Sequence, residues 1–117
     1  MVLLLYPFQM KKGGNMIELL CIKPRNMNYL NDYHVSVASS YEEAKQMICS
    51  AEQSGKPYDQ LDLPIYHFRD EQEFWDFLKW MTIHNRRYAF SVSGIQSTIK
   101  FVKIRDKCRE MGFTFLD

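Results

Sequence analysis

The chain has 117 residues, of which 46% are hydrophobic and 15% aromatic, and its formal net charge is +1. This length fits one domain, and a composition so rich in apolar residues excludes an intrinsically disordered chain. A net charge so close to zero gives no general attraction to nucleic acid or to an anionic membrane surface.

The first residues raise the question of where the folded domain begins. The segment MVLLLYPF is apolar, but it lacks the basic region and cleavage site of a signal peptide and is too short to span a bilayer. One interpretation is that translation starts at Met16, because the residues KGG shortly before it can be encoded by a bacterial ribosome-binding sequence. The alternative is a strand over residues 2–6 that pairs with residues 17–22. We therefore expect residues 1–15 to be either an upstream extension or an extra edge strand, and residues 16–117 to form the domain.

The strands are predicted from runs of apolar residues. Residues 16–22 form a nearly continuous apolar run, which is typical of a strand buried on both faces. Residues 33–39 alternate apolar and polar side chains, as in a half-buried strand. The expected strands, in chain order, are residues 16–22, 33–39, 59–65, 87–93 and a short edge strand at 113–116.

Three helices are predicted from capping residues and apolar stripes. Ser40 with Glu43, and Asp70 with Glu73, have the spacing of a capping box, and Ser97 can cap the last helix. Apolar residues then recur with the helical period. The inward positions are Ala44, Met47, Ile48 and Ala51 in the first helix, Phe74, Phe77, Leu78 and Met81 in the second, and Phe101, Ile104, Cys108 and Met111 in the third.

Helices that alternate with strands predict a single α/β domain. Right-handed crossovers would build a mostly parallel sheet with helices on both faces. Ligands of such folds bind beyond the carboxyl ends of the strands. Those ends are expected at residues 23–25, 39–40, 64–67 and 93–96.

Several phrases along this pattern are similar to those of a known family. They are SYEEAKQMICSAE, YDQLDL, FWDFLKWM and KCREMGF. From about Ile17 to Phe113 the chain resembles the cyclic-phosphate-processing receiver-like domains, small relatives of the response-regulator receiver fold. The resemblance implies a receiver-like, flavodoxin-like domain, and it identifies the chain as a degenerate member of the family.

The degeneracy lies in the loops that would carry the chemistry. Family members have two aspartates and then an arginine after the first strand, whereas this chain keeps Arg25 but has Ile22 and Lys23 in place of the aspartates. Of the family's Asp-x-Asp-His-Asp phrase at the third strand, Asp62 matches the first residue and residues 64–66 differ. Metal-assisted or acid–base phosphate chemistry needs carboxylates, or a carboxylate with histidine, that converge on one site. We therefore expect no catalytic residue and no metal.

The last strand keeps only Ser93 of the family's His-Ser-x-Asn-Pro-x-Gly phrase. If the chain were nevertheless an enzyme, Asp62, His67 and Ser93 would be its catalytic candidates. Arg25 with Ser93 and Gly94 could hold an anion. The alternative for Arg25 is an internal ion pair, for His67 a surface position in a loop, and for Asp62 a structural role within the strand.

The leading functional hypothesis is a non-catalytic receiver-like domain that binds an unidentified protein. Such a domain could be a regulator, a phage or mobile-element protein, or an immunity partner. The candidate partner-binding residues are Trp75, Trp80, Lys100, Lys103 and Lys107. The tryptophans are five positions apart on one helix, so they point in different directions and one is expected at the edge of the apolar stripe.

Two alternatives remain open. The first is a phosphate-ester or cyclic-phosphate enzyme with a divergent site. The second is nucleic-acid binding through the basic C-terminal helix, because seven basic residues lie between Arg86 and Arg109 against Asp106 as the acidic residue. An acidic stretch from Ser39 to Asp76 makes the chain dipolar, so we expect weak and non-specific binding at most.

The three cysteines are Cys21, Cys49 and Cys108. They are far apart, lie among apolar neighbours, and show neither metal-ligand spacing nor a disulfide framework. We expect free, buried thiols in a reducing cytoplasm, no cofactor and no association with a membrane.

Overall fold

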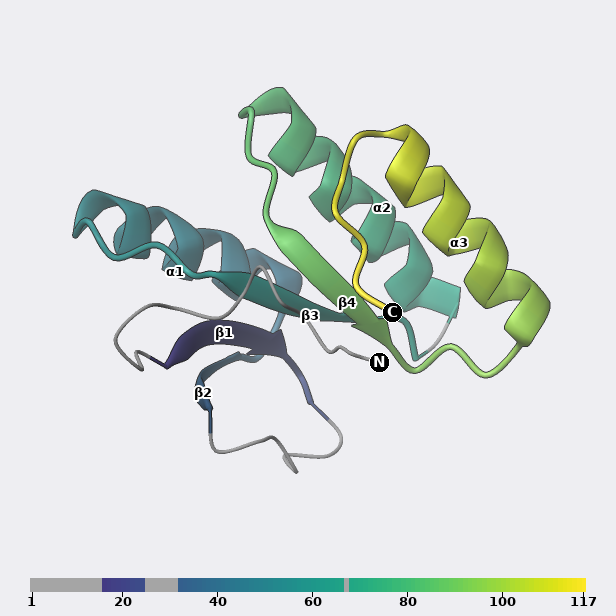
Figure 1. Cartoon of the computed structure of the whole chain (residues 1–117), viewed down its shortest axis with the longest axis horizontal. Helices are drawn as coiled ribbons and strands as arrows, with labels where there is room; N and C mark the ends of the chain where they lie inside the picture. Colours follow the sequence, from purple (N-terminus) through teal and green to yellow (C-terminus); the bar gives the residue numbers. More distant parts are fainter. Residues whose placement is uncertain (1–15, 25–31, 67) are drawn as a thin grey trace.

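The computed structural model of the chain describes residues 16–24, 32–66 and 68–117. The four strands among these residues form one parallel sheet in the order β2-β1-β3-β4 (Figure 1). This single domain confirms the predicted α/β class and is consistent with a flavodoxin-like fold. Its elements are β1 (Ile17–Ile22), β2 (Tyr33–Ala38), α1 (Tyr41–Gln53), β3 (Gln60–Pro64), α2 (Phe68–Ile83), β4 (Ala89–Ser93) and α3 (Thr98–Glu110).

The three described helices lie on one face of the sheet (Figure 1). Right-handed crossovers from β2 to β3 and from β3 to β4 advance in the same direction across the sheet, which places α1 and α2 on the same side. Ile48 of α1, Phe74 of α2 and Ile104 of α3 share one core with Leu61 and Phe90 of the strands. The predicted cover of the second face by helices is therefore not found within the described residues.

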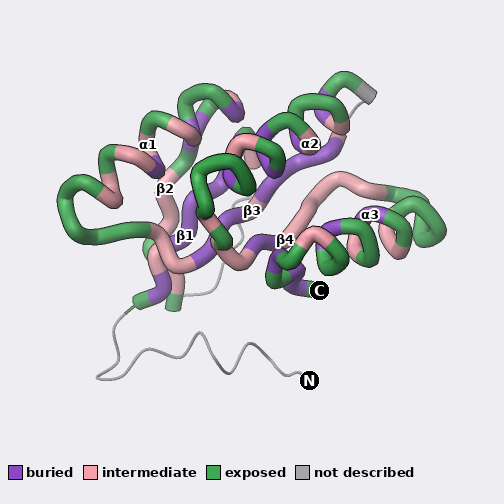
Figure 2. The backbone as a smooth tube through the Cα atoms, turned by 90° about the horizontal axis from the view of Figure 1, so that it is seen from above, coloured by how far each residue is buried: buried purple, intermediate pink, exposed green. Residues whose placement is uncertain are grey.

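β1 is one of the two inner strands of the sheet, and five of its six residues are buried. Figure 2 shows buried residues running through β1 and β3 in the middle of the sheet. All six residues of β1 pair with β2, and Leu19 to Cys21 also pair with β3. Over that stretch β1 therefore has a strand on each edge. Residues 1–15 themselves lie outside the described part of the chain.

The helix caps confirm two of three predictions. The hydroxyl of Ser40 accepts from the amide of Glu43 at 3.0 Å, and that of Ser97 accepts from the amide of Lys100 at 3.3 Å. The prediction for Asp70 is wrong, because α2 begins two residues earlier and Asp70 is its third residue. Its carboxylate accepts a hydrogen bond from the amide of Tyr66 at 3.3 Å, as a third helical residue can when it reaches back to the preceding turn.

The chain after α3 differs from the predicted edge strand. Phe115 forms a single parallel bridge with Phe90, so the expected strand at 113–116 is reduced to one pairing beside β4. The Phe90 ring nevertheless makes edge-on contacts with Phe113 and Phe115, at centroid distances of 5.5 and 5.7 Å. The last residues therefore close the core by aromatic packing.

No disulfide joins the three cysteines, and they are not equally buried. Cys21 and Cys108 are fully buried, and burial raises the pKa of the Cys108 thiol to about 12. Cys49 is only partly buried. None of the described helices is long and apolar enough to cross a membrane.

Candidate functional site

The end of β1 has an ion pair where the resembled family has aspartates. Lys23 follows the last strand residue and adopts a left-handed backbone, with φ of 44°. Its ammonium lies 3.5 Å from the carboxylate of Asp70, which is buried at 5% exposure. Because the same carboxylate also accepts from the amide of Tyr66, the buried charge is compensated within the chain.

Two tyrosines close the end of β3. The hydroxyl of Tyr41, at the start of α1, donates to the carbonyl of Pro64 at 2.7 Å, and burial raises the pKa of Tyr41 above its usual range. The hydroxyl of Tyr66 lies 3.3 Å from that of Ser93, at the end of β4. The ring of Tyr66 packs on Gly94, where a Cβ atom would be 2.2 Å from it.

Asp62 lies within β3, as expected. It is half-buried and accepts a hydrogen bond from the hydroxyl of Ser91 at 3.3 Å, across the β3–β4 pairing. Its neighbours in register are Cys21 of β1 and Ser91 of β4. The carboxylate therefore has a partner inside the sheet and lies two residues before the strand end.

The structure brings together only some of the predicted site residues. Ser93 and Gly94 meet at the carboxyl end of β4, beside Tyr66. Arg25 and His67 lie outside the described residues. Among residues 16–24, 32–66 and 68–117, no group of three histidine, cysteine, aspartate or glutamate side chains could hold a metal ion.

Three of the five predicted partner-binding residues join α2 to α3. The ammonium of Lys100 lies 2.6 Å from the carboxylate of Glu71, and that of Lys107 lies 4.4 Å from the ring centroid of Trp75. The indole N–H of Trp75 donates to Glu71 at 3.3 Å. The hydrogen bond from Lys100 is the main reason that the pKa of Glu71 is lowered. Lys103 is exposed on the same helix and makes no ion pair with a described residue.

Trp80 lies on the other side of α2, beside α1. Its ring is 5.5 Å from that of Phe77, and the guanidinium of Arg86 and the ammonium of Lys45 lie over it at 4.8 and 5.7 Å. Trp75 contacts α3 and Trp80 contacts α1, so the prediction that the two side chains point in different directions is confirmed. Both tryptophans are partly buried against the core.

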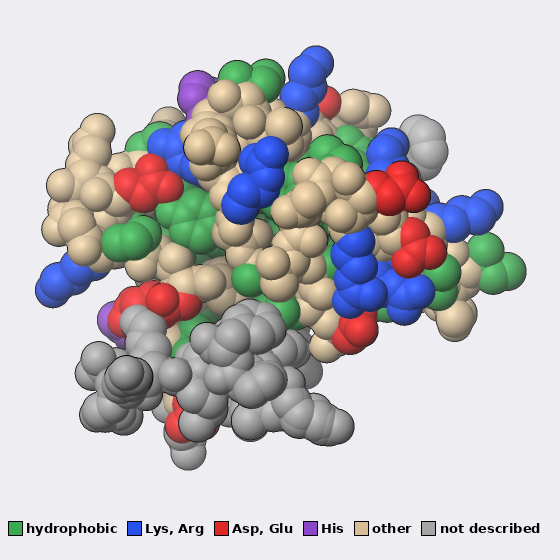
Figure 3. All heavy atoms as spheres, turned by 45° about the horizontal axis from the view of Figure 1, so that its top comes forward, with side chains coloured by type: hydrophobic (Ala, Val, Ile, Leu, Met, Phe, Trp, Pro, Cys, Tyr) green, Lys and Arg blue, Asp and Glu red, His purple; other side chains and the backbone are tan. Residues whose placement is uncertain are grey.

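The charged side chains over the helices do not form one continuous basic surface. Figure 3 shows lysine and arginine side chains beside aspartate and glutamate side chains over the helices. Charge reversal of Lys100 and Lys107 to glutamate would break their contacts with Glu71 and Trp75 inside the chain. Weaker partner binding in such a variant would therefore not locate a binding surface.

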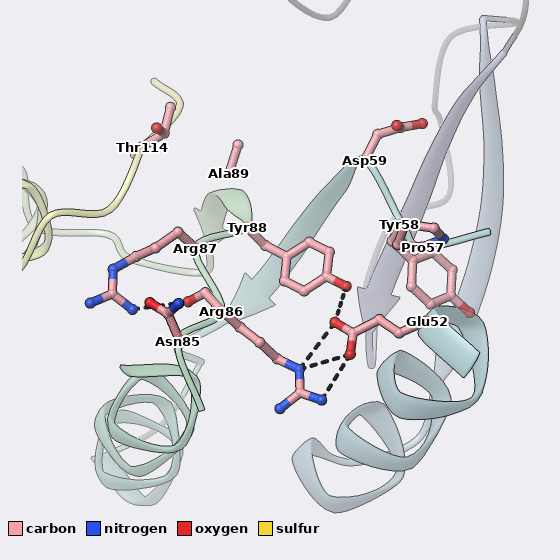
Figure 4. A pocket seen from close by; sticks show the side chains of 10 residues that line it. All are labelled: Glu52, Pro57, Tyr58, Asp59, Asn85, Arg86, Arg87, Tyr88, Ala89 and Thr114. Atoms are coloured by element: carbon pink, nitrogen blue, oxygen red, sulfur yellow. Dashed lines mark hydrogen bonds and ion pairs between the residues drawn. The ribbon is translucent and has the colours of Figure 1, made fainter. Parts of the chain in front are cut away.

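A pocket of about 650 Å³ opens at the opposite end of the sheet, beside the amino ends of β3 and β4 (Figure 4). The sequence did not predict this pocket, because ligands of parallel α/β sheets are expected at the carboxyl ends of the strands. The available signal was the run Arg86-Arg87-Tyr88 directly before β4. The lining residues come from the end of α1 and the chain after it, from the turn between α2 and β4 with the first residue of β4, and from the C-terminal segment.

One wall of this pocket is an ion pair supported by a tyrosine. Arg86 donates to Glu52 through Nη2 at 2.8 Å and through Nε at 3.0 and 3.1 Å, and the hydroxyl of Tyr88 donates to the same carboxylate at 2.5 Å. The hydrogen bond from Arg86 lowers the pKa of Glu52, and burial followed by the contact with Glu52 raises that of Tyr88. These three side chains hold the ends of α1 and α2 against β4.

Comparisons with protein-family models, curated proteins and solved structures found no match to this chain. The resemblance to receiver-like domains therefore depends on the sequence phrases, with the parallel strand order as a compatible framework.

Proposed function

We propose that the chain is a non-catalytic, receiver-like domain that acts by binding another protein. The observation that gives this proposal most support is that the polar groups at the carboxyl ends of the strands already have partners within the chain. Lys23 is paired with Asp70, and Tyr66 contacts Ser93 and packs on Gly94. Polar groups that are already partnered and covered by a ring are poorly placed to bind and transform a phosphate ester.

The first turns of α3 offer a surface for such a partner. Ile99 is 71% exposed, more than any other large hydrophobic residue in the described part of the chain. Lys103 follows one turn later on the same stripe of the helix and is also exposed. An apolar side chain beside an uncommitted cation suits a partner surface that combines apolar contact with acidic residues.

The experiment compares partner capture by the tagged wild-type protein and by the double variant Ile99→Ser/Lys103→Glu in a lysate of the native host. The matched control is Lys79→Glu/Ile83→Ser, which places the same two changes four positions apart on exposed sites of α2. We expect one partner to be retained by wild type and control and lost by the α3 variant. Equal retention by all three proteins would place the surface elsewhere, and no retained partner would contradict the proposal.

A metal titration tests the enzyme alternative directly. Millimolar Mg²⁺, Mn²⁺ or Ca²⁺ should leave the melting temperature unchanged, because a cation that binds the native state would stabilise it by mass action. A saturable rise in melting temperature would favour a divergent enzyme that uses Arg25, Asp62, His67 and Ser93.

A further inference from the structure

The pocket at the amino ends of β3 and β4 contains one cation that is held in place but not neutralised. The guanidinium of Arg87 lies over the ring of Phe113 at 5.2 Å, and its Nη1 donates to the carbonyl of Arg86 at 3.2 Å. Within the described residues, no carboxylate pairs with it. An arginine has five N–H donors, so most of those on Arg87 remain available.

The neighbouring arginine shows the opposite state. Arg86 forms an ion pair with Glu52, and Figure 4 shows the side chains of Arg86 and Tyr88 turned toward that carboxylate. The guanidinium of Arg87 points away from this ion pair in the same view. Because Glu52 is offset by Arg86, the end of the pocket near Arg87 has an unmatched positive charge.

Other lining residues add hydrogen-bonding groups and an apolar wall. The side chains of Asn85 and Thr114 have no hydrogen-bond partner among the described residues. Asn85 has a left-handed backbone, with φ of 56°, a conformation that favours asparagine after a helix. This role does not use the side-chain amide. Pro57 and the rings of Tyr58 and Tyr88 supply flat apolar surface.

The second acidic side chain of the pocket constrains the ligand. Asp59 accepts a hydrogen bond from the amide of Glu18 at 2.7 Å. It lies on the far side of the Tyr88 ring from Arg87 (Figure 4). A ligand therefore fits best with its anionic group at Arg87 and with an uncharged part, or a hydrogen-bond donor, toward Asp59.

From this arrangement we propose that the pocket binds a small organic anion, in which a carboxylate or phosphate group is joined to a planar ring. Arg87 binds the anionic group, because a guanidinium held by stacking loses little freedom when the ligand arrives. The ring of Tyr88, which lies between Arg87 and the wall formed by Pro57 and Tyr58 (Figure 4), contacts the planar part. The site lies at the opposite end of the sheet from Lys23, Tyr66 and Ser93. The proposal does not depend on protein binding through α3.

The test is a titration of the whole chain with benzoate, phenyl phosphate and benzyl alcohol, followed by amide NMR shifts and by calorimetry. We expect one of the two anions to shift the amides of Tyr58 and of residues 87–89 saturably, and the neutral alcohol to bind at least about tenfold more weakly. The anion that binds more tightly identifies the head group. Benzyl alcohol binding as tightly as the anions, or no binding of either anion up to about 10 mM, would overturn the proposal.

Variants then test the role of Arg87. Arg87→Gln should weaken the binding of the preferred anion by about tenfold or more, while Arg87→Lys keeps the charge and should retain part of the affinity. The matched control is Arg69→Gln, an exposed arginine at the other end of α2, which should bind the anion as the wild type does. Thermal melts show whether each variant is folded. Wild-type affinity in a folded Arg87→Gln protein would exclude Arg87 as the anion-binding residue.

Discussion

Gly94 is the residue at which the absence of a side chain has the clearest consequence. Its backbone has φ of 92°, and the ring of Tyr66 occupies the space that a Cβ atom would need. Sequence analysis placed Gly94 in a possible anion site, because glycine after a strand can present backbone amides. The structure instead places an aromatic ring there, and a sequence motif cannot reveal a contact with a ring 28 positions earlier in the chain.

Replacing Gly94 with alanine should destabilise the protein more than the same change at Gly55. Both glycines have a positive φ, so alanine costs about 1–2 kcal/mol of backbone strain at either position. At Gly55 the new methyl group meets no atom within 4 Å, whereas at Gly94 it meets the Tyr66 ring at 2.2 Å and the carbonyl of Ile65 at 2.9 Å. We expect urea unfolding to show an additional loss of at least about 1 kcal/mol for Gly94→Ala. Equal losses in the two variants would mean that Tyr66 does not pack on Gly94.

At the scale of elements, α2 and α3 are joined by residues that sequence analysis assigned to an external partner. Trp75 and Lys107 were candidates because large aromatics and basic stripes are common at interfaces. In the fold they meet each other, and Lys100 meets Glu71. Helical spacing correctly placed these side chains outside the apolar stripe, but it could not show that a second helix covers them.

A double-mutant cycle measures this helix contact. Lys100→Ala and Glu71→Ala, alone and together, should give a coupling free energy of about 0.5–1 kcal/mol, because both side chains are only partly exposed. The control cycle pairs Lys103→Ala with Glu71→Ala and should give no coupling, since Lys103 makes no ion pair with a described residue. Chemical denaturation of the variants provides the free energies. A coupling for Lys100 no larger than that for Lys103 would contradict the contact.

The ion pair between Glu52 and Arg86 should make stability depend on pH. The pKa of Glu52 is lowered in the folded protein, so its contribution is complete above the unfolded pKa, about 4.3, and is lost as pH falls through the folded value. At pH 7, Glu52→Gln should cost about 1–3 kcal/mol. The difference in unfolding free energy between the wild type and Glu52→Gln should shrink as the pH is lowered below about 4.

Urea unfolding at pH 7 and at pH 3 measures this gap. The matched variant is Glu42→Gln, because Glu42 is 76% exposed on the same helix and pairs with Lys45 at 3.7 Å. It should change stability little at either pH. A gap for Glu52→Gln that stays constant between pH 7 and pH 3 would show that the carboxylate charge does not stabilise the fold.

Across the whole molecule, the acidic and basic parts of the sequence are less separate than their positions in the chain suggest. Arg86 and Lys100 belong to the basic C-terminal part, and they pair with Glu52 and Glu71 of the acidic middle part. These pairs reduce the dipole that the sequence predicts. Four of the seven basic residues from Arg86 to Arg109 pair with carboxylates, which leaves Arg87, Lys103 and Lys107 without an ion pair among the described residues.

Binding to duplex DNA should accordingly be weak and sensitive to salt. Fluorescence anisotropy at physiological ionic strength should give a dissociation constant weaker than about 10 µM, with no difference between unrelated sequences. Lower salt should strengthen the binding, since counterion release would supply most of its free energy. Tight or sequence-dependent binding would favour the nucleic-acid alternative over protein binding.

The α/β class, the order of the elements and the inward stripes of all three helices were determined by the sequence. They depend on hydrophobic period and on caps such as Ser40 and Ser97, which act within a few residues. The start of α2 was missed because Asp70 can act either as a cap or as a residue of the first turn.

Only the tertiary structure decided which polar groups are free to meet a ligand or a partner. Tyr66 reaches Ser93 across 27 positions, and Arg86 reaches Glu52 across 34. The same packing places both ions of the Glu71–Lys100 pair between two helices and leaves Arg87 without a carboxylate partner in the part of the chain that the structure describes. These pairings depend on strand order and on the side of the sheet that each crossover takes. Both are set by the packing of the whole core, which no local pattern of residues contains.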